Sequence, residues 1–185
     1  MSQSEKVRVA VVGATGYTGA ELLRLLHLHA RAEVAVVAGN GKVGQKIANV
    51  LPSFHGTLQG EVVGVDAAAI AQGCQAAFCG LPHGASAPIV RDLRARGVVV
   101  FDLSADFRLK DLSVYREWYG EHGAPELNEQ AVYGLPEFER AAIAKADLVA
   151  VPGCYPTASA LALAPLVQGQ VIDLESIIVD AKSGA

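Results

Sequence analysis

A glycine turn near the start of the chain, set between an apolar strand and an apolar helix, most constrains the fold. Residues 7–12 (VRVAVV) form a short, β-branched run of the kind found in buried parallel strands. They lead into GATGYTG and then into a leucine-rich helical segment. Strand, glycine turn and helix in this order are the context that a dinucleotide site requires. Such glycines permit a tight turn, a close approach to a pyrophosphate and close helix–strand packing.

We therefore expect this turn to bind a dinucleotide. Its spacing is G-x-x-G-x-x-G and not the commoner G-x-G-x-x-G, so a turn that holds no ligand remains the alternative. The residues of the turn predicted to contact the cofactor are Gly13, Thr15, Gly16, Tyr17, Thr18 and Gly19.

The end of the second predicted strand, residues 33–38, bears on which dinucleotide is bound. An NAD site usually places Asp or Glu there to bind the ribose 2′-hydroxyl. No acidic residue occurs between positions 34 and 60, whereas Asn40 and Lys42 follow the strand directly. This pattern favours a 2′-phosphate, and hence NADP (NADPH) over NAD. Lys42 as an ordinary solvated loop residue is the alternative.

The remaining pattern predicts an α/β fold, a Rossmann-like, doubly wound and mostly parallel sheet. The chain has 185 residues, of which 51% are hydrophobic, enough for one sizeable core. The charged and aromatic segment 110–134 is expected to cover the cleft. Further strands are predicted at 61–65, 76–80, 98–101, 148–151 and 176–180, and further helices at 67–72, 85–96, 139–145 and 157–167.

Two turns that follow predicted strands are candidate parts of the site, since ligands bind beyond the carboxyl ends of parallel strands. After residues 76–80 come Leu81 and Pro82, which we expect to face the cofactor, and His83, either a cleft residue or a turn residue. After residues 98–101 comes DLSADFR. Its charges could form a capped turn, or Arg108 could bind a carboxylate or phosphate as a two-pronged donor.

Cys154 lies on a second strand-to-helix elbow, VPGCYPTA. Pro156 suits the first turn of a helix, which places the cysteine at the helix N-terminus. The positive end of a helix dipole favours the ionised form of a thiol, which is the nucleophile. We expect Cys154 to be reactive, by analogy with nucleophile turns. The alternative is a buried structural cysteine.

Composition excludes several other classes. A formal net charge of −4 gives no electrostatic case for nucleic-acid binding. The sequence shows neither a membrane-spanning apolar run nor a signal peptide, so a cytoplasmic protein is expected. Three cysteines without metal-ligand spacing indicate neither a disulfide framework nor a zinc site, and no metal is expected.

The motifs GATGYTGAELLRLL, GLPHGAS, DLSADFRL, YGLPE, VPGCYPTA and DAKSG occur here in an order that resembles the N-acetyl-γ-glutamyl-phosphate reductases of arginine biosynthesis. The resemblance implies reduction of an acyl phosphate to N-acetylglutamate semialdehyde by NADPH, through a thioester on Cys154. It adds Ser183 and Gly184 to the cofactor site, and Arg108 and Lys182 as substrate-binding residues. The substrate is a small molecule, and the complete protein is expected to be a homo-oligomer.

The domain expectation is an NADP-binding domain over residues 1–153 and a truncated second part over 154–185. The second part would hold the nucleophile helix and the first strand of an α+β catalytic or dimerisation domain, which the chain does not complete. No histidine here matches the acid/base histidine of the family, so this chain alone is expected to be inactive or incomplete. Two alternatives remain: a lysine-biosynthesis relative acting on carrier-linked aminoadipyl phosphate, and a non-catalytic NADP-binding module.

Overall fold

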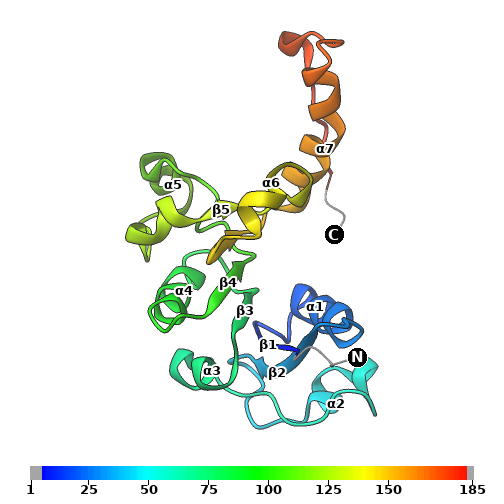
Figure 1. Ribbon diagram of the computed structural model, residues 1–185, viewed down its shortest axis with the longest axis vertical. Coiled ribbons are helices and arrows are strands. Elements are labelled where there is room, and N and C mark those ends of the chain that lie inside the picture. Colours follow the sequence, from blue (N-terminus) through cyan, green and yellow to red (C-terminus); the bar gives the residue numbers. More distant parts are fainter. Residues whose placement is uncertain (1–5, 183–185) are drawn as a thin grey trace.

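The computed structural model describes residues 6–182 and contains a six-stranded sheet with helices on both faces (Figure 1). The strands are β1 (Val7–Val12), β2 (Ala32–Ala38), β3 (Ala76–Cys79), β4 (Val99–Asp102), β5 (Val132–Tyr133) and β6 (Leu148–Ala150). The α-helices are α1 (Tyr17–His27), α2 (Ile47–Val50), α3 (Ala67–Gly73), α4 (Ser86–Arg94), α5 (Leu112–Tyr119), α6 (Pro136–Ile143) and α7 (Cys154–Gln168). Three 3-10 helices are η1 (Pro52–Phe54), η2 (Pro125–Gln130) and η3 (Leu174–Ser176).

The sheet order is β2-β1-β3-β4-β6-β5, and every pairing is parallel. The chain moves outward from β1 to β2 and then crosses back to lay β3 on the other side of β1. This reversal is a topological switch point, and in open parallel sheets ligands bind beside it at the carboxyl ends of the strands. The predicted doubly wound, Rossmann-like fold is confirmed, and it directs attention to the turns after β1 and β3.

Alternation along β1 divides the core into two layers. Ala10 and Val12 point toward one face and pack with residues of α3 and α4, whereas Val9 and Val11 point toward the other and pack with residues of α1 and α2. All four are 0–3% exposed. Successive side chains of a strand point to opposite faces, so a strand covered on both sides must be apolar throughout, as β1 is.

Two predicted strands are not formed. Residues 61–65 make only isolated bridges, an antiparallel one between Lys46 and Glu61 and a parallel one between Val63 and Ala38 at the end of β2. Ser176 is the last residue of η3, residues 177–180 have no regular structure, and within residues 6–182 no strand pairs with them. A strand is stabilised by hydrogen bonds to its neighbour, so β-branched composition alone does not produce one.

The segment 110–134 packs on the α4 side of the sheet instead of covering the cleft. His122 lies against Phe107 and Tyr115, and a Cβ on Gly123 would contact Pro88 of α4 at 2.9 Å. The prediction that residues 110–134 cover the cleft is therefore wrong. The rings of Tyr115, Tyr119 and His122 pack against one another and against Phe107 of the turn after β4.

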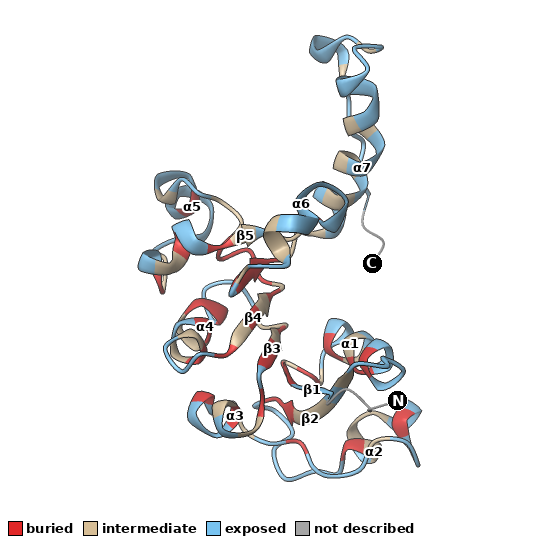
Figure 2. Cartoon of the chain, viewed as in Figure 1, coloured by how far each residue is buried: buried red, intermediate tan, exposed pale blue. Residues whose placement is uncertain are grey.

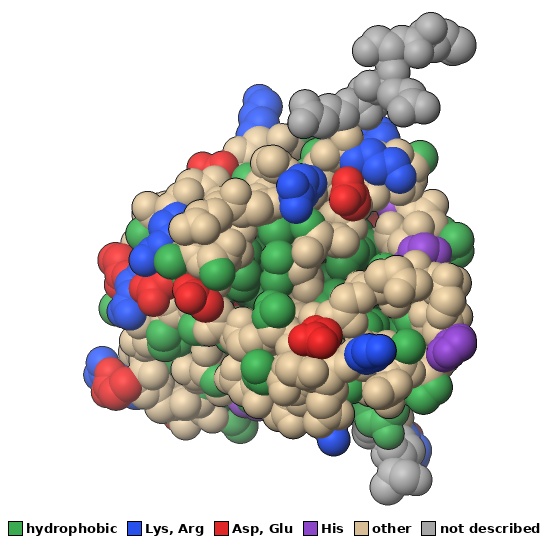
Figure 3. All heavy atoms as spheres, turned by 90° about the horizontal axis from the view of Figure 1, so that it is seen from below, with side chains coloured by type: hydrophobic (Ala, Val, Ile, Leu, Met, Phe, Trp, Pro, Cys, Tyr) green, Lys and Arg blue, Asp and Glu red, His purple; other side chains and the backbone are tan. Residues whose placement is uncertain are grey.

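Helix α7 projects away from the sheet, and the chain that follows it returns alongside it (Figure 1). Burial is concentrated in the sheet and the inner helix faces, whereas α7 is exposed along most of its length (Figure 2). Basic and acidic side chains are interspersed around apolar ones on the face drawn in Figure 3. Across residues 6–182, no helix combines the length and apolarity needed to span a membrane.

Candidate active site at the Cys154 elbow

The elbow begins where β6 ends. The Val151 amide extends the β4–β6 pairing by donating to the Asp102 carbonyl at 2.8 Å. Gly153 is the N-cap of α7 and Cys154 its first residue. Gly153 brings no side chain to the first helical N–H groups, and its carbonyl accepts the Thr157 hydroxyl at 2.9 Å. The sulfur therefore lies at a helix N-terminus, the position predicted from the sequence.

Cys154 is exposed and lines a cavity of about 320 Å³. The cavity joins the first turn of α1, the turns after β3 and β4, and the elbow itself. Its lining residues are Thr18, Gly80, Leu81, Leu103, Arg108, Val151, Pro152, Gly153 and Cys154. The structure therefore brings four of the predicted site residues together: Thr18, Leu81, Arg108 and Cys154. Leu103 also lines the cavity but was not predicted, because nothing in the sequence distinguishes this apolar residue of DLSADFR as a site residue.

The glycine turn after β1 is shaped by backbone contact. Gly13 has φ +79°, and a Cβ there would lie 2.3 Å from the Gly80 carbonyl oxygen. A Cβ on Gly19 would lie 2.4 Å from the Gly13 carbonyl oxygen, so this glycine allows α1 to pack onto the end of β1. A Cβ on Gly16 would meet only the Gly13 carbonyl oxygen, at 3.6 Å. Gly16 thus faces space that a ligand could occupy, whereas the other two serve the fold.

Arg108 is held in place by main-chain carbonyls. Its Nε donates to the Val151 carbonyl at 2.8 Å and one terminal nitrogen donates to the Leu103 carbonyl at 2.7 Å. The other terminal nitrogen, Nη1, lies 3.1 Å from where a Cβ on Gly153 would stand. The guanidinium thus bridges the ends of β4 and β6 and presents Nη1 at Gly153, in the wall of the cavity that Cys154 also lines. A fixed cation beside a helix N-terminus is a suitable arrangement for an anion.

The two aspartates of DLSADFR are buried and do not pair with Arg108. Asp102 accepts the Ser86 hydroxyl at 2.5 Å and the Ser104 hydroxyl at 2.6 Å. Burial raises the pKa of the Asp102 carboxyl, and these two hydrogen bonds oppose that shift. The motif therefore combines the two possibilities left open by the sequence, since its aspartates stabilise a turn while its arginine is presented to the cavity.

The three cysteines occupy different environments. Cys74 and Cys79 are buried, whereas Cys154 is exposed. Burial raises the pKa of the Cys79 thiol, and the neighbouring Asp102 carboxylate raises it further. Burial also raises the pKa of the Cys74 thiol, with Arg8 acting in the opposite direction. Both buried thiols are thereby kept protonated and inert, so only Cys154 combines access with a helix N-terminus.

The end of β2 lies beside the glycine turn, as its predicted role requires. A Cβ on Gly39 would lie 3.3 Å from the Thr15 side chain, which fixes the separation of the two turns. Asn40 Oδ1 accepts the Val65 amide at 3.4 Å, and both Asn40 and Lys42 are exposed. Tyr17 is 100% exposed at the start of α1. Asn40 and Lys42 follow β2, which pairs with β1 on the side away from β3, and neither they nor Tyr17 line the Cys154 cavity.

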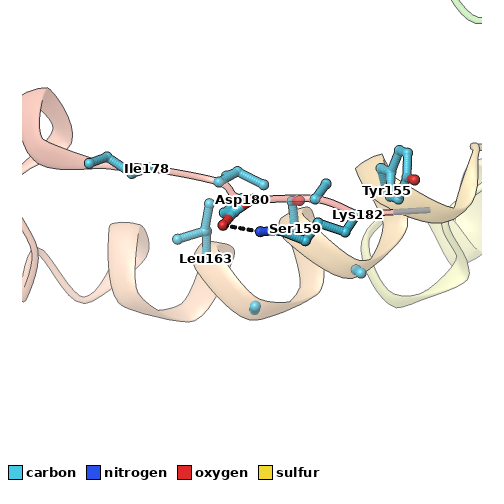
Figure 4. Close-up of a pocket in the computed structure, with 10 residues that line it drawn as sticks. Tyr155, Ser159, Leu163, Ile178, Asp180 and Lys182 are labelled. Atoms are coloured by element: carbon cyan, nitrogen blue, oxygen red, sulfur yellow. Dashed lines mark hydrogen bonds and ion pairs between the residues drawn. The ribbon is translucent and has the colours of Figure 1, made fainter. Parts of the chain in front are cut away.

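Other predicted residues lie elsewhere. Pro82 is exposed beside the cavity residue Leu81, and His83 packs edge-on against Tyr119, outside the cavity. Lys182 pairs with Asp180 and lines a separate cavity of about 500 Å³ between α7 and residues 178–182 (Figure 4). The structure does not bring Lys182 to Cys154. Ser183 and Gly184 lie outside the described residues.

Comparison with protein families identifies the fold. Residues 8–146 match the model described as "Semialdehyde dehydrogenase, NAD binding domain". The chain belongs to the semialdehyde dehydrogenase family. Residues 154–185 match a second model of this family, "Semialdehyde dehydrogenase, dimerisation domain".

Several curated proteins that resemble the chain are named N-acetyl-gamma-glutamyl-phosphate reductase. The N-acetyl-gamma-glutamyl-phosphate reductase of Pseudomonas fluorescens is 46% identical over 96% of this chain and 52% of its own length. The protein of the same name from Rhodospirillum rubrum is 50% identical over 98% of this chain and 53% of its own length. The chain thus spans about half the length of the curated relatives it matches.

Solved structures of the semialdehyde dehydrogenase family share the fold. The aspartate semialdehyde dehydrogenase of Candida albicans, determined with NADP, has a TM-score of 0.65 at 17% identity and covers 89% of this chain and 48% of its own. Aspartate semialdehyde dehydrogenase II of Vibrio cholerae, complexed with ASA, has a TM-score of 0.66 at 20% identity. The alignment covers 89% of this chain and 47% of the Vibrio chain. At these identities the likeness concerns the fold alone.

Proposed function

We propose that this chain supplies the cofactor site and the nucleophile of an N-acetyl-γ-glutamyl-phosphate reductase of arginine biosynthesis. The observation that carries the proposal is a single cavity in which Cys154, at a helix N-terminus, shares walls with Thr18 of the glycine-turn helix and with Arg108. The names of relatives at 46% and 50% identity support this substrate over a carrier-linked aminoadipyl phosphate.

The glycine turn fits a bound dinucleotide. Gly16 faces open space beside a main-chain turn, and α1 begins immediately after it. Phosphates bind at such N-termini because the N–H groups and the helix dipole favour negative charge. In the proposal the phosphates are held by the turn that Gly13, Thr15, Gly16, Tyr17, Thr18 and Gly19 form, in which Gly13 and Gly19 set the backbone shape. The adenosine end is held by Asn40 and Lys42. Bound NADPH supplies a hydride.

The choice of NADPH over NADH rests on charge at the end of β2. No acidic residue occurs between positions 34 and 60, and Lys42 is exposed two residues after Asn40. An exposed ammonium can accompany a 2′-phosphate, and there is no carboxylate in this stretch to repel it. The match of residues 8–146 to the NAD-binding domain of the family supports a nicotinamide cofactor without distinguishing the two.

Cys154 performs the covalent step. Its thiolate attacks the acyl carbon, the carbon–oxygen bond to phosphate breaks, and phosphate leaves with the bonding electron pair. Addition of a hydride at the same carbon, which a bound NADPH would supply, would convert the thioester to the alkoxide of a hemithioacetal. Cleavage of the carbon–sulfur bond then releases the semialdehyde and restores the thiolate. Main-chain N–H groups at the start of α7 stabilise the negative oxygen.

Arg108 serves the phosphate side of the reaction. Two of its nitrogens are occupied by the carbonyls of Val151 and Leu103, which leaves Nη1 directed at the elbow. A cation fixed in this way binds an anion without first losing rotamer freedom. Lys182 is proposed as a second substrate-binding group, although it pairs with Asp180 in this structure. Leu81 and Pro82 are proposed to contact the nicotinamide end of the cofactor. Ser183 and Gly184 are also proposed as cofactor-binding residues.

We further propose that residues 1–153 form the NADP-binding domain and residues 154–185 the first part of a second one. The family match at 154–185, described as a dimerisation domain, supports this division and an oligomeric protein. Apolar side chains exposed around α7, among them Leu161 and Leu166, suit a helix that becomes buried in such a domain. A cytoplasmic location fits a biosynthetic enzyme.

The test is an assay of the protein as expressed from its own gene. Phosphate-dependent oxidation of N-acetylglutamate semialdehyde by NADP is measured for the wild type and for Cys154→Ser. The variant should lose turnover while NADPH affinity, followed by fluorescence titration, stays within about twofold. Retained turnover would overturn the covalent step, and activity with carrier-linked aminoadipate semialdehyde alone would overturn the substrate. NADPH binding without turnover in the wild type would favour a non-catalytic module.

A further inference from the structure

A buried carboxylate lies behind the walls of the Cys154 cavity and has no part in the proposed chemistry. Asp106 is 0% exposed. One oxygen accepts the Gly84 amide at 2.8 Å and the Tyr115 hydroxyl at 2.9 Å, and the other accepts the Ala87 amide at 2.9 Å. Its main-chain carbonyl contacts His122 Nε2 at 2.6 Å. A carboxylate buried this deeply requires such partners, and here they come from three separate elements.

These hydrogen bonds connect two walls of the cavity. Gly84 ends the turn after β3 that begins with the wall residues Gly80 and Leu81. Asp106 belongs to the turn after β4 and precedes the wall residue Arg108 by two positions. The Asp106 carboxylate therefore fixes the spacing between the turn after β3, which contributes Gly80 and Leu81 to the cavity, and the turn after β4, which contributes Arg108.

The position of Arg108 depends on this turn. The Arg108 amide donates to the Ala105 carbonyl, and the Asp106 amide donates to the Ser104 hydroxyl at 3.0 Å. Among residues 6–182, the guanidinium is bound only by the carbonyls of Leu103 and Val151, both of which line the cavity. A shift of the Ser104–Arg108 turn would move Nη1 relative to Cys154, because no side-chain carboxylate of the described residues anchors the guanidinium.

We propose that Asp106 is a positioning residue, which holds the turns after β3 and β4 together and thereby sets the Arg108 cation beside the Cys154 sulfur. This inference rests on the proposed function, since it takes Arg108 as the anion-binding group of the site. The competing interpretation is a helix cap that stabilises α4 without affecting the cavity. Both interpretations predict lower stability when Asp106 is changed, so stability cannot distinguish them.

The distinguishing measurement is the charge preference of Cys154 alkylation in the full chain. Rates are measured with iodoacetate, an anion, and iodoacetamide, a neutral analogue, and the site is assigned by peptide mass spectrometry. The ratio of the two rates reports positive charge beside the sulfur and cancels changes in thiolate content or general access. A cation a few ångströms away should raise the ratio about fivefold over a free thiol in water.

Asp106→Asn and Tyr115→Phe are the test variants. Asn offers one acceptor oxygen where Asp offers two, so it cannot keep all three hydrogen bonds. Tyr115→Phe removes one donor and keeps the ring. The matched control is Asp111→Asn, the same substitution at the exposed N-cap of α5, where Asp111 accepts the Ser113 amide at 2.8 Å. Arg108→Gln defines the ratio without the cation.

We expect Asp106→Asn to lower the ratio at least about twofold, Tyr115→Phe to lower it less, and Asp111→Asn to leave it at the wild-type value. A folded Asp106→Asn with the wild-type ratio would overturn the positioning role while leaving the proposed function intact. If that variant does not fold, Tyr115→Phe decides, and a wild-type ratio there overturns the role. A wild type that matches Arg108→Gln would instead contradict the proposed use of Arg108, and the positioning role with it.

Discussion

Residues 7–150 and residues 154–182 are built from the same apolar residue types, yet only the first region buries them. Val11 and Leu23 are 0% exposed, whereas Leu161 in α7 is 37% exposed and Ile178 is 90% exposed. Helix α7, which the structure describes throughout, has no buried residue. The comparison teaches that helix formation follows local preference, while burial needs a partner surface.

The candidate site lies on the boundary between these two regions. Thr18, Gly80, Leu103 and Arg108 belong to the packed region, and only Cys154 begins the exposed one. The packed side supplies fixed walls, and the elbow is fastened to it through Val151 and Arg108. The nucleophile therefore has rigid surroundings even though its own helix is open.

The largest expected difference between the regions concerns their thiols. In the native chain near neutral pH, iodoacetamide should modify Cys154 at least about a thousandfold faster than Cys79. The reason is that Cys79 is buried and burial keeps its thiol protonated. Peptide mass spectrometry of a time course measures both rates. Comparable rates in the folded chain would contradict the contrast between a packed and an open region, and unfolding in urea should remove the difference.

A matched pair of leucine substitutions tests the energetic side of the comparison. Leu23→Ala removes a fully buried side chain of α1 and should lower the free energy of unfolding by about 2–5 kcal/mol. In this 185-residue chain, where Leu161 of α7 is 37% exposed, Leu161→Ala should change it by less than about 0.5 kcal/mol. Urea unfolding followed by circular dichroism measures both. A cost for Leu161→Ala similar to that for Leu23→Ala would show that α7 is packed in solution.

Two glycines of the turn after β1 separate positions that the fold needs from positions that a ligand could use within the packed region. Gly19→Ala would place a Cβ 2.4 Å from main-chain oxygen, so we expect a loss of about 3 kcal/mol or more. Gly16→Ala meets nothing closer than 3.6 Å and should cost about 1 kcal/mol or less. It should nevertheless weaken NADPH binding, measured by fluorescence titration, because a ligand phosphate would approach there. Equal stability losses would contradict the division of roles.

The smallest expected effect is in the pH dependence of stability. Burial raises the pKa of Asp102, so its contribution favours folding below about pH 4 and is lost as the pH rises through the folded-state pKa. Hydrogen bonds from Ser113 lower the pKa of the exposed Asp111. Its contribution is present above about pH 4 and is lost as the pH falls through the folded-state pKa.

The two aspartates should therefore give opposite slopes. Relative to the wild type, the free energy of unfolding of Asp102→Asn should increase as the pH rises above about 4, and that of Asp111→Asn should decrease as the pH rises toward about 4. Urea unfolding at constant ionic strength measures both differences. Slopes of the same sign would mean that Asp102 is hydrated in solution and not buried.

Local sequence signals determined the order of elements in the packed region. The β-branched runs, the glycine turn and the helix after Gly153 predicted β1, α1, β2, β3, β4, β6 and α7 close to their observed bounds. They also predicted the position of Cys154 at a helix N-terminus. These features depend on backbone preferences and on alternation, which neighbouring residues in the chain fix by themselves.

Only the tertiary structure decided how distant residues meet. The sequence could not predict that Asp106 would bind Gly84, Ala87 and Tyr115, because these contacts join three elements separated by up to 22 positions. It also failed for residues 61–65 and 176–180, whose composition favours strands but which lack a neighbouring strand along their length. Strand pairing and side-chain networks depend on what stands opposite, and a single stretch of sequence does not contain that information.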